Sequence, residues 1–353
     1  MLNNRTFFVV TQLTRSSMHT HEYSLLEILG DGVFHSGEDL GRSLNVSRTA
    51  IWKQIRKLKQ LGLEIESVSG RGYCLAHGVT LLNRQAIREG LSPQSDSALS
   101  EIDLYLSIDS TNSEAMRRIQ KGAKGRQLIV AEQQLAGRGR RGRAWLSPMA
   151  RNVYMSLIWP FDNGITALEG LSLVIALSLV RALQELGLPG MEHLRVKWPN
   201  DVWLQNKKLA GILLELQGDA QGPLQVVIGI GLNVNMPLQL HQEIQQPVTD
   251  LSSNGNFKVD RNRIVTQVVS QLDKDLRQFS ASGFAAFKDT WHQYDVFHGQ
   301  TVEVTRGNNR IVGKVTGVDA TGALVLSTPT GIELITGGEV FPSVRVLPKE
   351  RLQ

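Results

Sequence analysis

The residue pattern predicts an α+β protein of several domains, because the hydrophobic period changes twice along its 353 residues. Residues 22–76 combine short amphipathic helices with one β-hairpin, and residues 82–295 alternate apolar strands with long helices. Residues 299–350 contain only short strands separated by glycine turns. Residues 1–21 show no clear period and are expected to form an extension, unless translation begins at Met18.

Composition indicates a globular cytoplasmic protein. An apolar fraction of 41% with 20% charged residues is typical of globular proteins, and the net charge of +5 favours a polyanionic partner. The single cysteine, Cys74, excludes an intramolecular disulfide and fits a reducing compartment. The uncharged run 170–180 is shorter than the ~20 residues that span a bilayer, and the apolar run 7–10 is too short for a signal peptide. We therefore expect no membrane partner.

The first region has the element order of a winged helix-turn-helix. One helix is predicted over 22–29 and a second from Ser36. In the third helix, residues 48–61, apolar side chains recur at steps of four and three, and Ser47 is placed to cap it. Residues 63–75 alternate with period two around a glycine turn, which predicts the hairpin, or wing, after the third helix.

Basic residues concentrate around this third helix. Six lysines and arginines and no acidic residue lie between Leu40 and Leu63. Such a helix favours binding in a DNA groove, and a dimer on an operator with two half-sites would supply specificity. A basic helix of a protein-interaction module is the alternative. The candidate DNA-binding residues are Ser47, Arg48, Thr49, Trp52, Lys53, Arg56 and, in the hairpin turn, Arg71.

The central region is predicted to form a mixed α/β sheet. Residues 205–207 join two apolar segments as a hairpin, so the sheet is at least partly antiparallel. The expected strands are 103–108, 127–132, 152–159, 194–198, 201–205, 208–217 and 224–235, and the expected helices are 111–121, 165–187 and 260–280.

The last region is predicted to form a small β-barrel. Its expected strands are short and are separated by turns that contain glycine. They are 301–305, 310–318, 323–327, 332–336 and 344–347.

A glycine- and arginine-rich loop, residues 137–143, is the most distinctive local feature. Glycine allows close approach of the backbone to a ligand, and arginine forks match phosphate or carboxylate oxygens. The glycines have dinucleotide-binding spacing, but residues 143–148 cannot form the helix that such a site requires. A disordered RNA-binding tail is a second alternative. The interpretation that fits best is a loop that wraps an anion and is mobile when empty.

Three further segments belong with this loop. Residues 109–112 lie between a predicted strand and a predicted helix. Thr111 and Glu114 have the spacing of a capping box at the start of that helix. The alternative to ligand binding by Thr111 is that it only caps the helix. Lys197 and Lys208 lead into buried strands, which is costly unless each holds an anion or an ion pair. Residues 229–235 form a strand whose glycines indicate close backbone approach.

Taken together, the motifs Gly137–Arg143, Lys197–Asp201, Lys208–Ile212 and Gly229–Asn235 resemble those of the biotin–protein ligases. With the helix-turn-helix in front, the chain resembles the bifunctional ligase and biotin-operon repressor. The resemblance implies a central ligase domain and a C-terminal SH3-like barrel. It also implies that biotin and ATP form biotinyl-5′-AMP, and that a lysine of the biotin carboxyl carrier protein of acetyl-CoA carboxylase then takes the biotinyl group.

The resemblance also assigns roles to individual residues. Lys197 and Lys208 would stabilise carboxylate and phosphoryl charge, and Asp201 would lie near the incoming amine or a Mg²⁺ ion. No Ser-His-Asp set is required, no metal-ligand set is expected, and His292 and His298 are interpreted as structural. The residues implied to bind biotin or its adenylate are Ser110, Thr111, Asn112, Gln134, Gly137, Arg138, Gly139, Arg140, Asn200, Lys208 and Gly211.

The resemblance also has implications for regulation and for how adenine is bound. By resemblance, the adenylate orders the loop and favours a homodimer that binds the operator and represses transcription. The family can pack an aromatic ring on the adenine from the loop after residue 235, but Val248 stands in that part of this chain. Two alternatives stay open, namely a ligand-sensing repressor without ligase activity and a ligase for a related acid such as lipoate.

Overall fold

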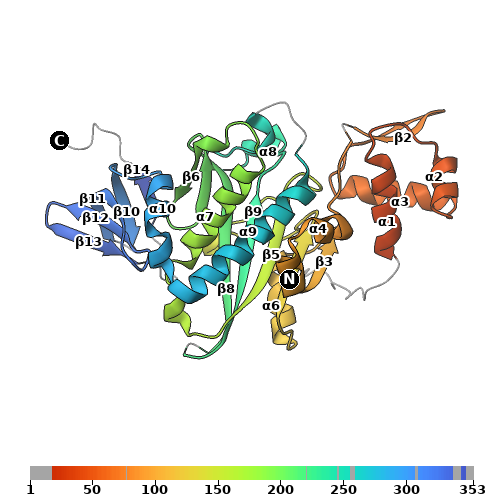
Figure 1. The fold of residues 1–353 in the computed structure, drawn as a ribbon. Coiled ribbons are helices and arrows are strands. Elements are labelled where there is room, and N and C mark those ends of the chain that lie inside the picture. The colour runs from red at the N-terminus through yellow and green to blue at the C-terminus, as the bar shows by residue number, and fades with distance from the viewer. Residues whose placement is uncertain are drawn as a thin grey trace, which may run out of the picture. The chain divides into compact units, whose positions relative to one another are not determined.

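The computed structural model describes residues 18–76, 78–219, 221–244, 246–254, 259–306, 309–336 and 343–346. The chain divides into two compact units, Met1–Thr80 and Leu81–Gln353, and each is described by itself (Figure 1). The greater part of the expected extension, residues 1–17, and the last residues of the expected C-terminal barrel lie outside the described residues.

The first unit is the expected winged helix-turn-helix. Its third helix begins at Arg48 because Ser47 caps it, with the Ser47 Oγ accepting a hydrogen bond from the Ala50 N–H at 3.2 Å. The first helix begins at Met18, four residues earlier than expected. The elements are α1 (Met18–Leu29), α2 (Gly37–Ser43), α3 (Arg48–Gln60), β1 (Ile65–Val68) and β2 (Gly72–Leu75).

The second unit contains the expected mixed sheet, of seven strands in the order β3-β4-β5-β9-β8-β7-β6. Only β3 and β4 run parallel, and the other neighbours are antiparallel. Gln205 and Asn206 turn the chain between β7 and β8 with positive φ angles, as a two-residue hairpin requires. The strands are β3 (Leu99–Tyr105), β4 (Arg126–Ala131), β5 (Val153–Phe161), β6 (Leu194–Lys197), β7 (Asp201–Leu204), β8 (Lys207–Gly218) and β9 (Leu224–Leu232).

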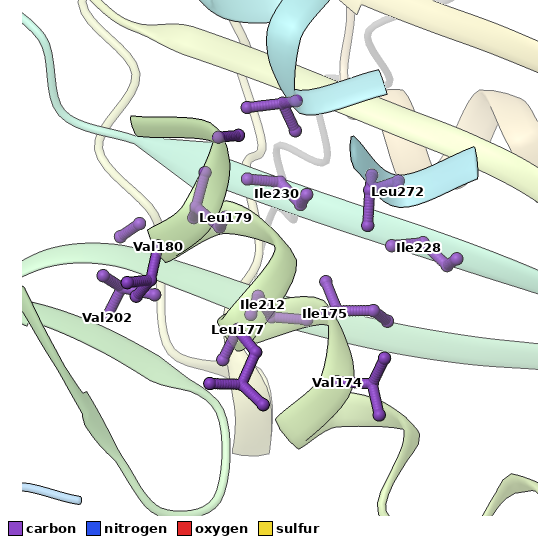
Figure 2. Packing of buried hydrophobic residues seen from close by; sticks show 14 of the residues in the cluster. Val174, Ile175, Leu177, Leu179, Val180, Val202, Ile212, Ile228, Ile230 and Leu272 are labelled. Carbon is purple, nitrogen blue, oxygen red and sulfur yellow. The ribbon is translucent and has the colours of Figure 1, made fainter. Parts of the chain in front are cut away.

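Helices cover both faces of this sheet. Long helices α7 and α9 pack on one face, where the α7 side chains Val174 and Leu177 belong to the same cluster as Ile212 and Ile228 (Figure 2). On the other face α6 packs through a smaller apolar cluster. The helices of this unit are α4 (Arg84–Gly90), α5 (Pro93–Ala98), α6 (Thr111–Gln120), α7 (Leu171–Glu185), α8 (Leu238–His241), α9 (Arg261–Ser282) and α10 (Lys288–Tyr294).

The apolar segment that contains α7 is a core helix. By length and composition, Ile165–Glu185 could cross a membrane. However, eleven of the fifteen α7 residues are buried against the sheet and α9. The helix predicted over 165–187 is divided in two, because Gly170 adopts a φ of 77° between a short 3₁₀ turn at Ile165–Leu168 and α7.

The C-terminal strands form an antiparallel sheet in the order β13-β12-β11-β10-β14. This confirms a small all-β, SH3-like region. Closure into a barrel is not seen, because β13 and β14 lie at opposite edges and do not pair within the part of the chain described. The strands are β10 (Thr301–Arg306), β11 (Asn309–Val318), β12 (Leu324–Thr328), β13 (Gly331–Ile335) and β14 (Ser343–Val346).

Candidate active site and DNA-binding face

A cavity of about 980 Å³ lies against the central strands β8 and β9, and bare backbone forms part of its wall. Gly211 and Gly231 face each other across β8 and β9, and both line the cavity together with Gly229. A Cβ at Gly229 would overlap the Asn112 amide oxygen, and one at Gly231 would overlap the Trp145 indole. These glycines therefore make room for side chains that lie directly on the sheet, as the glycine pattern had indicated.

The first turn of α6 forms one end of the cavity. Ser110, not Thr111, caps the helix, since its backbone is extended and its Oγ accepts a hydrogen bond from the Ser113 N–H at 3.4 Å. Glu114 does not reach back to the cap but binds Tyr105 and Arg117. The capping box predicted at Thr111 and Glu114 is therefore wrong by one residue, because only the residue at the extended position can be the cap.

Thr111 is turned toward Gln134 instead. The Gln134 Oε1 lies 2.9 Å from the Thr111 backbone nitrogen and 3.1 Å from its hydroxyl oxygen. Asn112 binds Glu215 Oε2 at 2.8 Å through its amide nitrogen. The four residues that the resemblance assigns to one ligand all line the cavity, namely Ser110, Thr111, Asn112 and Gln134.

The Gly/Arg loop lies over the cavity and is held by two of its arginines. The Arg138 guanidinium contacts Glu215 at 3.1 Å and the Ser113 hydroxyl at 3.2 Å. The Arg140 Nη1 donates a hydrogen bond to the Asn200 side-chain oxygen at 2.5 Å. Burial lowers the pKa of Arg140 to about 10, and the negative charge of Asp201 opposes that shift.

The glycines of the loop differ in role. Gly139 lines the cavity, whereas Gly137 is buried and does not. A Cβ at Gly137 would lie 2.6 Å from the Trp145 carbonyl oxygen. Gly137 therefore allows the loop to fold back on itself, and its contact with a ligand stays a prediction.

The corner between β6 and β8 brings together the two lysines and the carboxylate. The Lys208 Nζ lies 2.9 Å from Asp201 Oδ1, and both side chains are largely buried. The Lys197 Nζ lies 4.6 Å from the centre of the Trp203 ring. The structure thus confirms that lysine charges at this corner have partners, and it places both amines in the wall of the cavity.

Trp145 is a cavity residue that sequence reasoning missed. It lies two residues after the end of the Gly/Arg loop and packs over Gly211 and Gly231, with its ring centre 5.4 Å from the Lys208 amine. Its Nε1 has no hydrogen-bond partner among the described residues. Val248 is buried beside the Lys208 backbone and is not a lining residue, whereas Trp145 lines the cavity together with Trp198 and Trp203.

We searched the described residues for side chains that could together hold a metal ion. Among the described residues, no group of three His, Cys, Asp or Glu side chains is placed to hold a metal ion. His292 and His298 lie edge to face with ring centres 6.0 Å apart, and burial lowers the pKa of His292.

The candidate DNA-binding residues are exposed at the start of α3, along α3 and in the hairpin turn of the first unit. The apolar face of α3 is buried, and the opposite face is exposed, including 51% of Trp52. In the hairpin turn, the Arg71 guanidinium lies 4.0 Å from the Phe34 ring centre. All seven candidates are exposed, namely Ser47, Arg48, Thr49, Trp52, Lys53, Arg56 and Arg71.

Fold and cavity together define a biotin- or lipoate-type protein ligase with a helix-turn-helix unit. Residues 105–233 match the model of the Biotin/lipoate A/B protein ligase family, and residues 297–341 match the Biotin protein ligase C terminal domain. Residues 21–74 match an HTH domain.

Individual relatives narrow this class. The chain is 38% identical to the bifunctional ligase/repressor BirA of Escherichia coli, over 91% of this chain and 97% of that protein. It is 33% identical to BirA of Bacillus subtilis, over 87% and 93% of the two chains. A biotin protein ligase from Aquifex aeolicus in complex with biotin and ATP is 31% identical, with a TM-score of 0.59 over 70% of this chain and 100% of that chain. The chain belongs to the family of bifunctional biotin–protein ligases and repressors.

Proposed function

We propose that this protein activates biotin with ATP to biotinyl-5′-AMP and transfers the biotinyl group to a lysine of a biotin carboxyl carrier protein. The adenylate also acts as a corepressor for binding to operator DNA. The observation that carries the proposal is the cavity of the second unit, where a polar end at Ser110–Gln134 and a cationic corner at Lys197 and Lys208 lie under one arginine loop.

In the first step, a biotin carboxylate oxygen attacks the α-phosphorus of ATP, and the bond to the β-phosphate breaks to release pyrophosphate. The reaction brings a carboxylate close to a polyphosphate, so positive charge is required where they meet. Lys197, Lys208 and Arg140 supply that charge in a partly buried site, where it acts more strongly than in water. The Asp201 carboxylate holds the Lys208 amine in place for this role.

In the second step, the amine of the acceptor lysine attacks the acyl carbon, and AMP leaves with the electron pair of the broken bond. Both nucleophiles belong to substrates, so this chain contributes position and charge. Asp201, paired with Lys208, lies near the incoming amine. A Cβ at Gly211 would lie 3.2 Å from the Lys208 side chain, so the glycine leaves space there for the acyl group.

Adenine and a metal ion have candidate partners in the same cavity. The Trp145 ring is positioned to stack on adenine beside the Lys208 amine. A Mg²⁺ ion bound to substrate phosphates needs only one or two protein carboxylates, and Asp201 fits that requirement. Bound there, the ion would neutralise the charge of the phosphates.

Each of the three regions of the chain has its own role. Residues 22–76 bind operator DNA through the exposed face of α3, and residues 82–295 carry out the chemistry in the cytoplasm. Residues 299–350 support the cationic corner, because the Trp198 indole N–H donates a hydrogen bond to the Gly322 carbonyl at 3.0 Å. The loop that closes on the adenylate favours a homodimer, and that dimer binds two half-sites.

Pyrophosphate–ATP exchange tests the enzyme. We expect exchange that depends on biotin and that lipoate does not support. Exchange with lipoate alone would redirect the assignment to the related acid, and no exchange with either acid would leave a ligand-sensing repressor. DNA affinity that does not respond to biotin plus ATP would contradict the corepressor role.

A further inference from the structure

Trp52 is a large aromatic side chain on the surface of the helix-turn-helix unit. It is the fifth residue of α3, and 51% of it is exposed. The core-facing side of α3 is occupied by other residues, since Ile51, Ile55 and Leu58 are buried there. One exposed apolar residue is ordinary on a protein surface, so the argument depends on where this indole lies and what surrounds it.

The surroundings of Trp52 favour DNA as its partner. Arg48, Trp52 and Arg56 follow one another at steps of four residues, which places them along one side of the helix. The Arg56 guanidinium lies 5.8 Å from the centre of the Trp52 ring, within the range of a cation–π contact. From Arg42 to Lys59 the chain carries six lysines and arginines and no acidic residue. This charge draws a polyanion to the side of the helix that carries the indole.

The chemistry of the indole then selects one feature of a DNA groove. In a helix-turn-helix, residues near the start of the third helix contact base edges in the major groove, and Trp52 begins the second turn of α3. Those edges carry hydrogen-bonding groups, with one apolar exception, the C5 methyl group of thymine. A ring placed over hydrogen-bonding edges would desolvate them without pairing them. On a methyl group the same ring buries apolar surface of both partners.

We propose that Trp52 reads thymine in operator DNA, through packing of the indole on a thymine methyl group in each half-site. The inference rests on the proposed function, because it assigns a specificity-determining residue to the operator-binding helix. Phosphate contacts of the neighbouring basic residues give affinity for any sequence, whereas the indole contact distinguishes thymine from the other bases. The two contributions are separable, since only the second depends on a methyl group.

The test uses the full-length protein with biotin and ATP, and a duplex that the wild-type protein selects from a random-sequence library. Thymines of one half-site are replaced singly by 2′-deoxyuridine, which keeps the base pair and lacks only the methyl group. At one position we expect this replacement to weaken wild-type binding about fourfold, the value for one buried methyl group. Trp52→Ala should bind the unmodified duplex several-fold more weakly and show no further loss at that position. Fluorescence anisotropy measures each affinity.

Lys53→Ala is the matched control, because it removes the neighbouring exposed side chain of α3 and keeps the ring. It should weaken binding of all the duplexes alike and lower the slope of log affinity against log salt by about one unit. The loss on removal of the methyl group should stay about fourfold. Trp52→Phe, which keeps an aromatic face, should retain a methyl effect, and Trp52→Gln, which has none, should lose it.

The outcomes separate this inference from the proposed function. Absence of sequence-selective DNA binding by the wild-type protein with biotin and ATP would contradict the operator-binding role itself. Selective binding in which no deoxyuridine replacement weakens the wild type more than Trp52→Ala would overturn the methyl contact alone. Unchanged DNA affinity of Trp52→Ala would also overturn it and would assign the exposed indole to a protein partner. If Trp52→Ala does not fold, an equal methyl effect in Trp52→Phe and Trp52→Gln would overturn it.

Discussion

Asp295 shows how the position of a single carboxyl group makes stability depend on pH. Its side chain is 8% exposed, and Oδ1 accepts a hydrogen bond from the Phe297 N–H at 2.9 Å. Oδ2 has no hydrogen-bond partner among the described residues. Burial raises the pKa of Asp295 from 3.8 to about 6, against the opposing effects of the Phe297 N–H and His298. The folded protein therefore binds this proton at a pH where the unfolded chain releases it.

The sign of the pH dependence follows from that difference. Between about pH 4 and pH 6 the folded state binds more protons, so the free energy of unfolding falls as the pH rises through this window. Asp295→Asn removes the charge that must be buried above pH 6. We expect the variant to be more stable than the wild type at pH 8, by on the order of 2–3 kcal/mol, and about equal at pH 4. Urea unfolding at the two pH values measures the difference.

Asp289→Asn is the matched control for this prediction, because Asp289 lies on the exposed side of α10. The control should change stability little at either pH. An Asp295→Asn effect of the same size at pH 4 and pH 8 would show that the carboxyl does not titrate as described.

At the scale of elements, one buried ion pair joins the start of α9 to the segment that follows β4. Arg261, the first residue of α9, lies 2.6 Å from the Glu132 carboxylate, and the two side chains are 4% and 0% exposed. Glu132 also accepts a hydrogen bond from the Leu82 N–H at 2.6 Å, where the chain enters the second unit. Two residues after Glu132 comes Gln134, which binds Thr111. The pair thus anchors the segment that leads into the Gly/Arg loop.

Glu132→Gln should be strongly destabilising, because it leaves the Arg261 charge buried without its counter-ion. We expect a loss of about 3–5 kcal/mol in the free energy of unfolding, measured by urea titration. The double variant with Arg261→Met should recover part of the loss, since it removes the uncompensated charge. Arg310→Gln, which breaks an ion pair whose arginine is 70% exposed, should cost less than about 1 kcal/mol. Similar losses for the two single variants would contradict this account.

At the scale of the whole molecule, the two units should carry separable activities. Arg48→Ala removes an exposed charge from α3, so affinity for a mixed-sequence DNA duplex at low salt should fall several-fold. The slope of log affinity against log salt should also decrease by about one unit. Biotin-dependent exchange should be unchanged, because the reacting groups lie in the second unit. Fluorescence anisotropy and the exchange assay measure the two effects.

The control for this prediction is Lys124→Ala, an exposed lysine of the second unit. It should leave DNA affinity close to that of the wild type. Equal losses for Arg48→Ala and Lys124→Ala would indicate that DNA binding depends on overall charge rather than on the α3 surface.

Much of the fold could be predicted because its signals are local. The 3.6-residue period of α3 and its Ser47 cap, the Gln205–Asn206 hairpin and the apolar strands of the sheet are each encoded within a few neighbouring residues. The Gly/Arg loop and the two lysines were likewise visible as short motifs. Errors arose where one residue decides between close alternatives, as with Ser110 and Thr111 at the start of α6.

The amino-acid order therefore predicted the helix-turn-helix unit and the mixed sheet, and the family resemblance of its motifs predicted which residues line the cavity. Tertiary structure decided which distant residues support them. Glu215 and Trp145 gain their roles because β8 and β9 lie side by side in a particular register, which places Gly211 opposite Gly231 beneath the Trp145 ring. A local period fixes which face of a strand each residue lies on, but which distant strands pair, and so which residues meet, depends on the tertiary fold. The open C-terminal sheet has the same cause, since closure depends on whether its edge strands meet.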